Sequence, residues 1–294
     1  MIVIERRIGF VPYRRVYFAR TGQNFRRTWL TSLRQYLGGP LPPSWRSREF
    51  HTILIDLNLS EDELFRGIKK STAYEIRRAE KDGIVFAEET NLETFRAFYN
   101  DFAPTKSLGL LGKANLSSMG KFLTITRADL ARSDPAGTDP SAAKPAMVEA
   151  AGGTPLCMHA YLVDPEESRA RLLYSATLVR DGAGVDRQIL GRANRRLHWL
   201  DMLRFKAQGI RWYDLGGIAH IDEQEGKLAE AVTSDTAPAT AGIDAFKTAF
   251  GGTAVREDHW DSPLLALAKG AVRFSRGILS AATRRSGIKQ AGRR

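Results

Sequence analysis

Three closely spaced arginines, Arg192, Arg195 and Arg196, are the first residues of this sequence whose type and spacing suggest chemistry. Guanidinium groups bind phosphate oxygens through paired hydrogen bonds, so such residues can hold a phosphorylated ligand. Arginines on a helix are also common as a solvated face, and for Arg195 and Arg196 we favour that interpretation. Arg192 remains the candidate for a phosphate contact.

A second candidate is Asp214, which ends a predicted strand just before the glycine pair Gly216 and Gly217. Its carboxylate could orient an amine, or it could accept hydrogen bonds from the N–H groups of the glycine turn. Aspartates in such turns more often make the second contact, and we favour it here.

The segment from Arg187 to Gly217 must position these residues. It is predicted as a glycine-containing turn, a helix of about four turns, a second turn at Gly209 and a short strand. Apolar residues at helical spacing predict the helix, and residues that favour extended structure predict the strand. The helical set is Leu197, Leu200, Met202, Leu203 and Phe205, and the strand set is Ile210, Trp212 and Tyr213. A helix leading directly into a strand, with glycines at both ends, is typical of ligand sites in α/β proteins.

The sequence gives little support for a metal site or for a catalytic nucleophile. The single cysteine, Cys157, has no cysteine partner, and the histidines show no metal-ligand spacing, so we expect no metal site. The five histidines are His51, His159, His198, His220 and His259. We find no Ser-His-Asp arrangement and no P-loop. His198, next to Trp199, could either pack in a core or catalyse.

Composition is that of a soluble globular protein. The 294 residues suffice for one large domain or two small ones, with 43% hydrophobic and 26% charged residues. A single cysteine excludes an internal disulfide and fits the reducing cytoplasm, where we expect the protein. The start carries Glu5, Arg6 and Arg7 and lacks the apolar core of a signal peptide. No run approaches the roughly 18 apolar residues that span a bilayer.

The net charge of +11 is unevenly placed. Residues 1–50 hold ten Arg and two Glu, and residues 262–294 hold eight Lys or Arg and no acid, so each end carries +8. The body between them carries −5. This distribution favours ends that touch an anionic surface, such as RNA or lipid head groups, although basic tails can also serve solubility alone.

We expect three parts along the chain: a basic leading segment over residues 1–51, a main domain over 52–261 and a basic tail over 262–294. In the leading segment, Arg14–Phe18 is predicted as a strand and Phe25–Leu37 as a helix. A run of Gly and Pro residues then ends any regular element.

The main domain begins with a strand over Thr52–Leu59 and a helix that Ser60 caps, with Glu63 completing a capping box. This helix is expected to end near Lys81. Further strands are predicted at Ile84–Glu88, Met147–Ala151, Leu156–Val163, Arg171–Leu178 and Thr253–Glu257, and further helices at Leu92–Phe102, Ser117–Ala131 and Ile243–Phe250. Turns separate the three middle strands, which suits an antiparallel meander.

From Ile84 onward, this order of elements resembles the GNAT acyltransferase superfamily. Two stretches resemble the Fem-type aminoacyltransferases and their single-domain GNAT relatives. The first stretch comprises Trp199, Gly209 and Tyr213-Asp214-Leu215-Gly216-Gly217. The second comprises Phe246-Lys247 and Phe250-Gly251-Gly252. The resemblance covers residues 52–257 and implies an α/β (α+β) fold with a GNAT-like mixed, mostly antiparallel central sheet flanked by helices. Fem enzymes have two GNAT domains, whereas this chain has room for one.

The resemblance implies a donor site at the start of the Arg187 helix. GNAT enzymes carry a Gln or Arg there, followed by two small residues, and Gln188, Gly191 and Ala193 match that pattern. Small residues allow backbone N–H groups and a helix N-terminus to approach a pyrophosphate. Arg192 and Asn194 share this stretch, either as donor contacts or as structural parts of a helix start.

The resemblance also implies where catalysis occurs. Phe246 and Lys247 match a pair in which the lysine neutralises charge on the substrate or on the oxyanion of acyl transfer. Tyr174 lies on the strand expected to splay beside the central one, where it could act as a general acid or pack as a core aromatic. The candidate catalytic residues are therefore Lys247, Asp214 and Tyr174, and the candidate substrate contacts are Phe246, Ser175, Gly216 and Gly217.

By resemblance, the chain transfers an acyl group to an amine without a metal. We expect acyl-CoA as the donor, because of the Gln188 pattern and the single domain. Aminoacyl-tRNA is the alternative donor, favoured by the two Fem-type stretches and the basic ends. A GNAT-fold binding module without turnover is a third interpretation. The acceptor implied is an amine-bearing small molecule or a lipid-linked precursor of the cell envelope or of a glycan.

The basic tail predicts contact with an anionic membrane surface. A helix over Pro263–Arg285 would place an apolar stripe on one face and bases opposite. The stripe is Leu264, Leu267, Ala271, Phe274, Ile278 and Ala281, and the bases are Lys269, Arg273 and Arg276. The same stripe could instead pack on the body of the protein, since Gly270 and Gly277 weaken an isolated helix.

Overall fold

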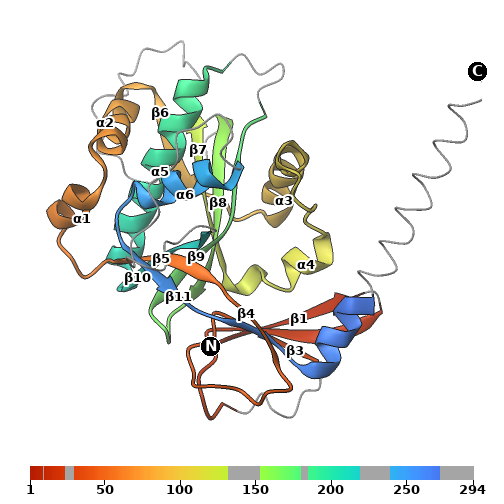
Figure 1. Cartoon of the computed structure of the whole chain (residues 1–294). Coiled ribbons are helices and arrows are strands. Elements are labelled where there is room, and N and C mark those ends of the chain that lie inside the picture. Colours follow the sequence, from red (N-terminus) through yellow and green to blue (C-terminus); the bar gives the residue numbers. More distant parts are fainter. Residues whose placement is uncertain (9, 24–29, 132–152, 180–184, 219–238, 272–294) are drawn as a thin grey trace, which may run out of the picture. The chain divides into compact units, whose positions relative to one another are not determined.

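A computed structural model describes the chain except for residues 9, 24–29, 132–152, 180–184, 219–238 and 272–294 (Figure 1). The chain divides into two compact units. Unit 1 comprises Met1–Phe50 with Glu257–Arg294, and unit 2 comprises His51–Arg256. The fold class predicted from the sequence, a mixed α/β protein with mostly antiparallel strands, is confirmed.

Unit 2 contains a seven-stranded sheet in the order β11-β5-β10-β9-β8-β7-β6. Its strands are β5 (His51–Asp56), β6 (Ile84–Glu88), β7 (Leu123–Leu130), β8 (Thr154–Asp164), β9 (Arg169–Thr177), β10 (Trp212–Ile218) and β11 (Thr253–Arg256). Neighbouring strands are antiparallel except for β9 and β10, which are parallel. The single parallel pair arises because helix α5 connects β9 to β10, as a crossover requires.

Two strands of the predicted meander are present, as β8 and β9, and the strand that pairs with β8 on its other side is β7. The β8–β9 turn is fixed by Asp164, whose carboxylate accepts the backbone N–H groups of Glu166 and Glu167. The predicted strand over Met147–Ala151 lies outside the described residues. The predicted helix over Ser117–Ala131 is wrong, because Leu123–Leu130 forms β7 and is buried on both faces. A short buried run of this kind gives helix and strand the same apolar signal.

Six α-helices of unit 2 are described. They are α1 (Glu61–Gly67), α2 (Lys70–Arg78), α3 (Leu92–Phe102), α4 (Lys113–Ser117), α5 (Arg187–Ala207) and α6 (Ala239–Thr248), with short 3₁₀ turns at Ala79–Lys81, Ala103–Lys106 and Gly120–Phe122. The Ser60–Glu63 capping box is confirmed. The single helix predicted from Ser60 to Lys81 is instead two, because the chain is extended at Ile68 and the Lys69 N–H bonds to the Ala249 carbonyl.

Helix α5 organises the core of unit 2. It packs on β7, β8 and β9 and against α2, while α3 packs on β8 and β9 from the other side of the sheet (Figure 1). The predicted apolar stripe of α5 is present, with Leu197, Met202 and Phe205 fully buried. These side chains join the core of the strands, so α5 and the face of the sheet beneath it form one packed body.

Unit 1 contains a five-stranded sheet in the order β1-β2-β3-β12-β4. Its strands are β1 (Ile2–Ile8), β2 (Val11–Tyr17), β3 (Thr31–Arg34), β4 (Arg46–Arg48) and β12 (His259–Asp261). The predicted strand over Arg14–Phe18 corresponds to β2. The predicted helix over Phe25–Leu37 is wrong where described, because residues Thr31–Arg34 pair with β2 and with β12. Pairing with strands distant in sequence overrides the local helical pattern.

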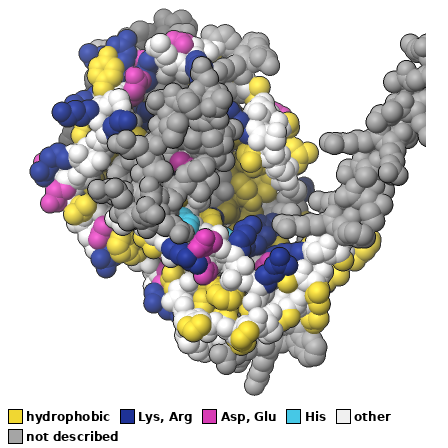
Figure 2. All heavy atoms as spheres, in the orientation of Figure 1, with side chains coloured by type: hydrophobic (Ala, Val, Ile, Leu, Met, Phe, Trp, Pro, Cys, Tyr) yellow, Lys and Arg dark blue, Asp and Glu magenta, His cyan; other side chains and the backbone are white. Residues whose placement is uncertain are grey.

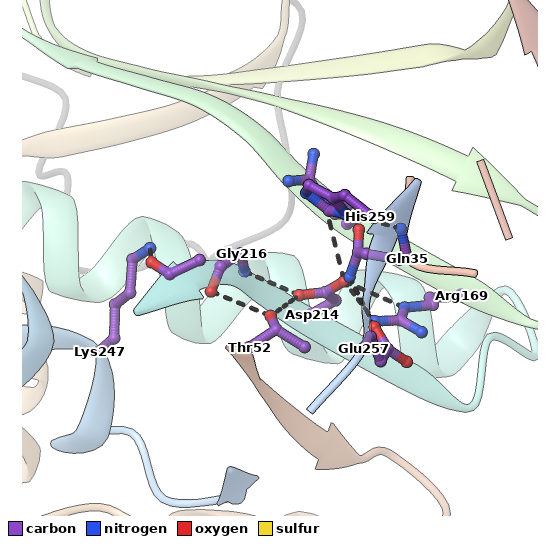
Figure 3. A network of polar contacts seen from close by, with 10 residues as sticks. Gln35, Thr52, Arg169, Asp214, Gly216, Lys247, Glu257 and His259 are labelled. Atoms are coloured by element: carbon purple, nitrogen blue, oxygen red, sulfur yellow. Dashed lines mark hydrogen bonds and ion pairs between the residues drawn. The ribbon is translucent and has the colours of Figure 1, made fainter. Parts of the chain in front are cut away.

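A buried polar contact ties the two sequence segments of unit 1 together (Figure 3). The Gln35 side chain donates to Glu257 at 2.9 Å, and the Gln35 backbone N–H donates to Nδ1 of His259 at 3.0 Å. These residues are more than 200 positions apart, so residues 257–261 complete a sheet that begins at the N-terminus.

A helical segment follows β12 over residues 263–271. Leu265 is fully buried, whereas Leu264 and Leu267 are 43% and 70% exposed. The rest of the predicted amphipathic helix lies outside the described residues. No helix in the described part of the chain is long and apolar enough to cross a membrane.

Candidate active site

Strands β9 and β10 separate at Asp214. Their parallel pairing covers Arg169–Arg171 and Trp212–Asp214, although both strands continue further. On its other side, β10 shifts register against β5 between Asp214 and Gly217. The sequence analysis expected a splayed pair of strands, and Asp214 lies at the point of separation.

Asp214 is fully buried in a compact cluster (Figure 3). Its carboxylate accepts two N–H groups of the Arg169 guanidinium at 2.7 and 3.0 Å, the Gly216 N–H at 2.8 Å and the Thr52 hydroxyl. The hydrogen bond predicted from the glycine turn is therefore present at Gly216. Gly216 has φ +75°, and a Cβ there would lie 3.0 Å from the Leu172 carbonyl oxygen, so only glycine fits.

Lys247 lies beside this turn on α6. Its ammonium donates to the Gly217 carbonyl at 2.6 Å. Burial lowers the pKa of Lys247 from 10.5 to about 8, although attraction to Asp214 partly opposes that shift. Lys247 is therefore a cation at neutral pH that loses its charge in a mildly alkaline range. The Gly251-Gly252 pair that follows has a structural cause, since a Cβ at Gly252 would lie 2.6 Å from the Leu54 carbonyl oxygen.

A cavity of about 760 Å³ adjoins the start of α5. Five residues singled out from the sequence line it: Gln188, Gly191, Asn194, Arg195 and Phe246. Lys106, Arg187 and Arg195 give the lining three bases, whereas Glu75 is the acid among the described lining residues. The Arg195 guanidinium lies over the Phe246 ring at 5.4 Å, which joins α5 to α6 at the cavity wall. A ligand of ordinary size carrying phosphate groups fits a cavity of this volume and charge.

The glycine-containing turn predicted at the start of this segment is wrong. Residues Gln188 to Ala193 already belong to α5, which begins at Arg187 and runs for 21 residues. Asp186 caps the helix, with its carboxylate accepting the Gln188 N–H at 2.9 Å. Gly commonly marks a turn, so the sequence predicts a helix start at Gly191, whereas the Asp186 cap lies more than one turn earlier.

Arg192 and Ala193 face away from the cavity. The Arg192 guanidinium bonds to both carboxylate oxygens of Asp82, which raises the pKa of Arg192, and Ala193 is buried in the core. Arg196 pairs with Glu80. These contacts tie α5 to the turn that follows α2, so in the described structure Arg192 serves packing rather than the cavity.

Comparison with solved structures gives the fold. The chain superposes on the crystal structure of FemX with a TM-score of 0.55, covering 90% of this chain and 85% of that one at 11% identity. This chain has a GNAT-like, Fem-type fold. At that identity the likeness defines the fold alone.

Two further structures give weaker superpositions. The C-terminal domain of a putative lysylphosphatidylglycerol synthetase from Agrobacterium fabrum gives a TM-score of 0.46 at 13% identity, covering 83% of this chain and 72% of that one. L-PGS from Bacillus licheniformis gives 0.47 at 12% identity, covering 79% and 67%. No protein-family model and no curated protein sequence matches the chain.

In this Fem-type fold, Tyr174 and Ser175 lie on opposite faces of β9. Tyr174 contacts the Tyr99 and Phe95 rings of α3 at 5.1 and 6.3 Å between ring centroids. Ser175 pairs across the strands with His159, on the face that α5 covers. The structure therefore brings Ser175, and not Tyr174, to the face of the sheet beneath α5.

A chain of buried polar side chains, which the sequence does not predict, lies beneath the cavity. It comprises His159 and Tyr161 of β8, His198 and Asp201 of α5, and Tyr213 of β10, each at most 1% exposed. Asp201 contacts Tyr161 and His159, Tyr161 contacts Tyr213, and Tyr213 contacts His198, all at 2.6–2.9 Å. Nε2 of His159 lies 2.7 Å from Oδ1 of Asn194, which lines the cavity.

The spacing of these five residues in the sequence gives only a weak signal of the buried hydrogen-bond chain. His159 and Tyr161 alternate on a strand and His198 and Asp201 are three apart on a helix, so each pair shares a face. Nothing in the sequence joins the two pairs, which lie about 40 residues apart. Among the described residues, no three His, Cys, Asp or Glu side chains lie close enough together to hold a metal ion.

Proposed function

We propose that this protein is an amine acyltransferase whose donor binds in the cavity at the start of α5. The observation that carries the proposal is the convergence of Gln188, Gly191 and Asn194 of α5 with Phe246 of α6 on one basic cavity in a Fem-type fold. We assign this chemistry to residues 52–261, with the basic segments 1–51 and 262–294 attached to it.

The reaction consists of two bond changes. The acceptor nitrogen forms a bond to the donor carbonyl carbon, and the C=O electron pair moves onto oxygen. When the C=O bond re-forms, the bond to the alkoxide or thiolate leaving group breaks, and the proton from nitrogen ends on that leaving group. Catalysis then consists of positioning the two substrates and stabilising the oxyanion.

The donor that we favour is an aminoacyl ester of tRNA. In α5 the backbone N–H groups after the first turn are used within the helix, and Asp186 occupies the Gln188 N–H, so the described part of the helix start offers no backbone cradle for pyrophosphate. Phosphate recognition therefore falls to side chains. Residues 66–81, which include α2 at the cavity edge, hold six bases and two acids, and Figure 2 shows basic side chains in the region of α2. Such a surface suits a polyanion.

The distance between Gln188 and Asn194 along α5 also supports an aminoacyl-tRNA donor. Gln188 and Asn194 are six positions apart, which corresponds to about 9 Å along a helix. A phosphate held near Arg187 would therefore place Asn194 a short distance away, within reach of an ester on the same nucleotide. The long pantetheine arm of coenzyme A separates its thioester much further from its phosphates.

Acyl-CoA is the second candidate donor. Gln188 and Gly191 match the GNAT pattern and both line the cavity. Lys106, Arg187 and Arg195 could together hold a diphosphate through side chains alone. No metal is required by either donor.

We assign the oxyanion and the acceptor to the region around the glycine turn. Lys247 supplies positive charge beside Gly216 and Gly217, and Asp214 holds that turn in place. Ser175, on the α5 face of β9, contributes to the acceptor side, and Tyr174 contributes only if the acceptor reaches the α3 face. The acceptor class is an amine-bearing small molecule or a lipid-linked amine.

Two measurements distinguish the donors. Retention of a charged tRNA pool on filters should be strong at low salt and fall steeply as salt rises, while coenzyme A should leave the melting temperature unchanged. A coenzyme A-dependent rise in melting temperature without tRNA retention would select acyl-CoA instead. If neither ligand binds, the proposed donor site is wrong.

We further propose that the C-terminal segment docks on an anionic membrane surface in the cytoplasm. Leu264 and Leu267 are exposed in the described helical residues 263–271, where the predicted amphipathic helix begins, and the segment 262–294 carries no acid. The full chain should sediment with anionic vesicles at low salt, and a chain truncated after Asp261 should stay in solution. Equal behaviour of the two chains would contradict the membrane assignment.

A further inference from the structure

The donor and acceptor groups determine the direction of each hydrogen bond in the buried chain of His159, Tyr161, His198, Asp201 and Tyr213. An ionised carboxylate only accepts hydrogen bonds, so both partners of Asp201 must donate to it. These partners are the Tyr161 hydroxyl at 2.6 Å and Nδ1 of His159 at 2.9 Å. Asp201 is therefore the acceptor on which the whole chain converges.

The direction continues from Tyr161 to His198. Tyr161 has one hydrogen, which it gives to Asp201, so it must accept from Tyr213 at 2.6 Å. Tyr213 must in turn accept from Nδ1 of His198 at 2.7 Å. Burial raises the pKa of both tyrosines, so they keep their hydrogens, and burial lowers the pKa of His198, so its ring stays neutral. The account thus assigns His198 the tautomer protonated at Nδ1.

The other arm of the chain leads to the cavity. Nδ1 of His159 donates to Asp201, and Nε2 faces Oδ1 of Asn194 at 2.7 Å. Because both partners are oxygens that accept, the ring carries a hydrogen on each nitrogen, as an imidazolium beside the Asp201 carboxylate, and Nε2 donates to Asn194. The oxygen of the Asn194 side chain is thereby occupied within the protein. Asn194 lines the cavity, so its amide nitrogen is the part of the side chain left for a ligand.

We propose that the Asn194 amide nitrogen donates a hydrogen bond to the carbonyl oxygen of the acyl donor, and that His159 and Asp201 are positioning residues which fix this orientation. The inference rests on the proposed function and deepens it. It adds a second group, besides Lys247, that meets the charge developing on oxygen. Asn194 gains and loses no proton in the step.

The physical benefit is a donor whose orientation is set before the substrate binds. A free asparagine side chain can turn either its oxygen or its nitrogen toward a ligand, and the wrong orientation would repel an oxyanion. Contact with His159, which Asp201 holds from behind, removes that choice. Oriented donors of this kind stabilise an oxyanion without reorganising at the moment of reaction.

The first test measures the protonation of the histidine ring nitrogens without any substrate. Nitrogen-15 spectra of the histidine rings in the folded protein should show His198 protonated at Nδ1 alone and His159 protonated at both ring nitrogens. If Nε2 of His159 carries no proton, the Asn194 amide is turned the other way and the proposal is wrong. Asp201→Asn should disturb both histidine signals, because the common acceptor then also becomes a donor.

The second test uses stable carbonyl compounds as probes. Puromycin carries an amide in place of the aminoacyl ester, and acetonyl-coenzyme A carries a ketone in place of the thioester. One of them should move a side-chain amide proton of Asn194 downfield, with the signal assigned from Asn194→Asp. If neither probe moves that signal at saturation, Asn194 does not contact the carbonyl.

The third test is kinetic. Asn194→Asp should lower kcat by about 100-fold with little change in the donor KM, since it removes an oxyanion donor while keeping the shape. Asn58→Asp makes the same change at an exposed residue outside the cavity lining, so it is the matched control and should keep the wild-type kcat. A wild-type kcat for Asn194→Asp would overturn the inference. A probe shift without turnover on either donor would instead leave the Asn194 contact in place and contradict the proposed function.

Discussion

Two of the buried aspartates of unit 2, Asp214 and Asp201, differ in what their hydrogen-bond partners connect them to. Asp214 faces the Arg169 guanidinium, so its charge is neutralised by a neighbour of opposite sign and its other oxygen closes the Gly216 turn. Asp201 is held by a tyrosine hydroxyl and a histidine ring, and through that ring it connects to the cavity.

This difference predicts different roles for the two buried carboxylates. A carboxylate paired with arginine mainly fixes the backbone around it, because breaking such a pair leaves a buried charge. A carboxylate at the end of a hydrogen-bond chain fixes the orientation of the groups in that chain, and here the last of them lines a cavity. We therefore expect losses of stability to concentrate at Asp214 and losses of transfer to concentrate at Asp201 and Asn194.

The largest effect on stability is expected from Asp214→Ala. It leaves the Arg169 guanidinium buried without this carboxylate, so the free energy of unfolding should fall by about 3–5 kcal/mol in urea titrations. Asp56→Ala, which breaks the exposed pair with Arg211, is the matched control and should cost less than about 1 kcal/mol. Equal costs would mean that the Asp214 cluster is not the structural element that we describe.

The largest effect on transfer at the Asp214 side is expected from Lys247→Ala. Removal of the ammonium beside Gly217 should reduce kcat by about 100-fold or more, while circular dichroism and melting remain close to wild type. Wild-type turnover with any identified substrate pair would exclude Lys247 from the site.

The pH dependence of the transfer rate supplies a control for the role of Lys247. Because the pKa of Lys247 is about 8, its charge is present below that pH and is lost as pH rises through it. The wild-type rate should fall there, and Lys247→Arg, which stays charged, should lose the fall even if it is slower. A wild-type rate that keeps rising through pH 9 would contradict a role for the cation.

A smaller effect is expected from Gly191→Ala. Within a helix, alanine is favoured over glycine by about 0.5–1 kcal/mol, so the melting temperature should rise. The new Cβ would lie 3.1 Å from Nη1 of Arg195, a flexible partner at the cavity wall, so donor binding should weaken. Stabilisation without any loss of donor binding would show that Gly191 is present for packing alone.

Local chemistry in the sequence predicted much of unit 2. The Ser60–Glu63 capping box, the meander of β8 and β9, the apolar stripe of α5 and the hydrogen bond within the Asp214 turn all follow from patterns that span a few residues. Such patterns determine their own geometry, which is why they could be read without a structure.

Features that depend on distant pairing could not be predicted. Leu123–Leu130 and Thr31–Arg34 carry helix-compatible patterns and become strands because neighbouring strands pair with them. The start of α5 was misplaced because Gly191 resembled a turn while Asp186 supplied the cap. His159 and Asp201 come from a strand and a helix, so their contact appears only once α5 lies on the sheet.

The most direct test of the comparison is one variant measured in two ways. Asp201→Asn keeps the shape of the side chain and the partners Tyr161 and His159, so the free energy of unfolding should fall by no more than about 1–3 kcal/mol. Its kcat for acyl transfer should fall at least tenfold at an unchanged donor KM, because Asn194 is no longer held in one orientation. A variant that keeps the wild-type kcat, or that loses transfer only in proportion to the fraction unfolded, would contradict the account.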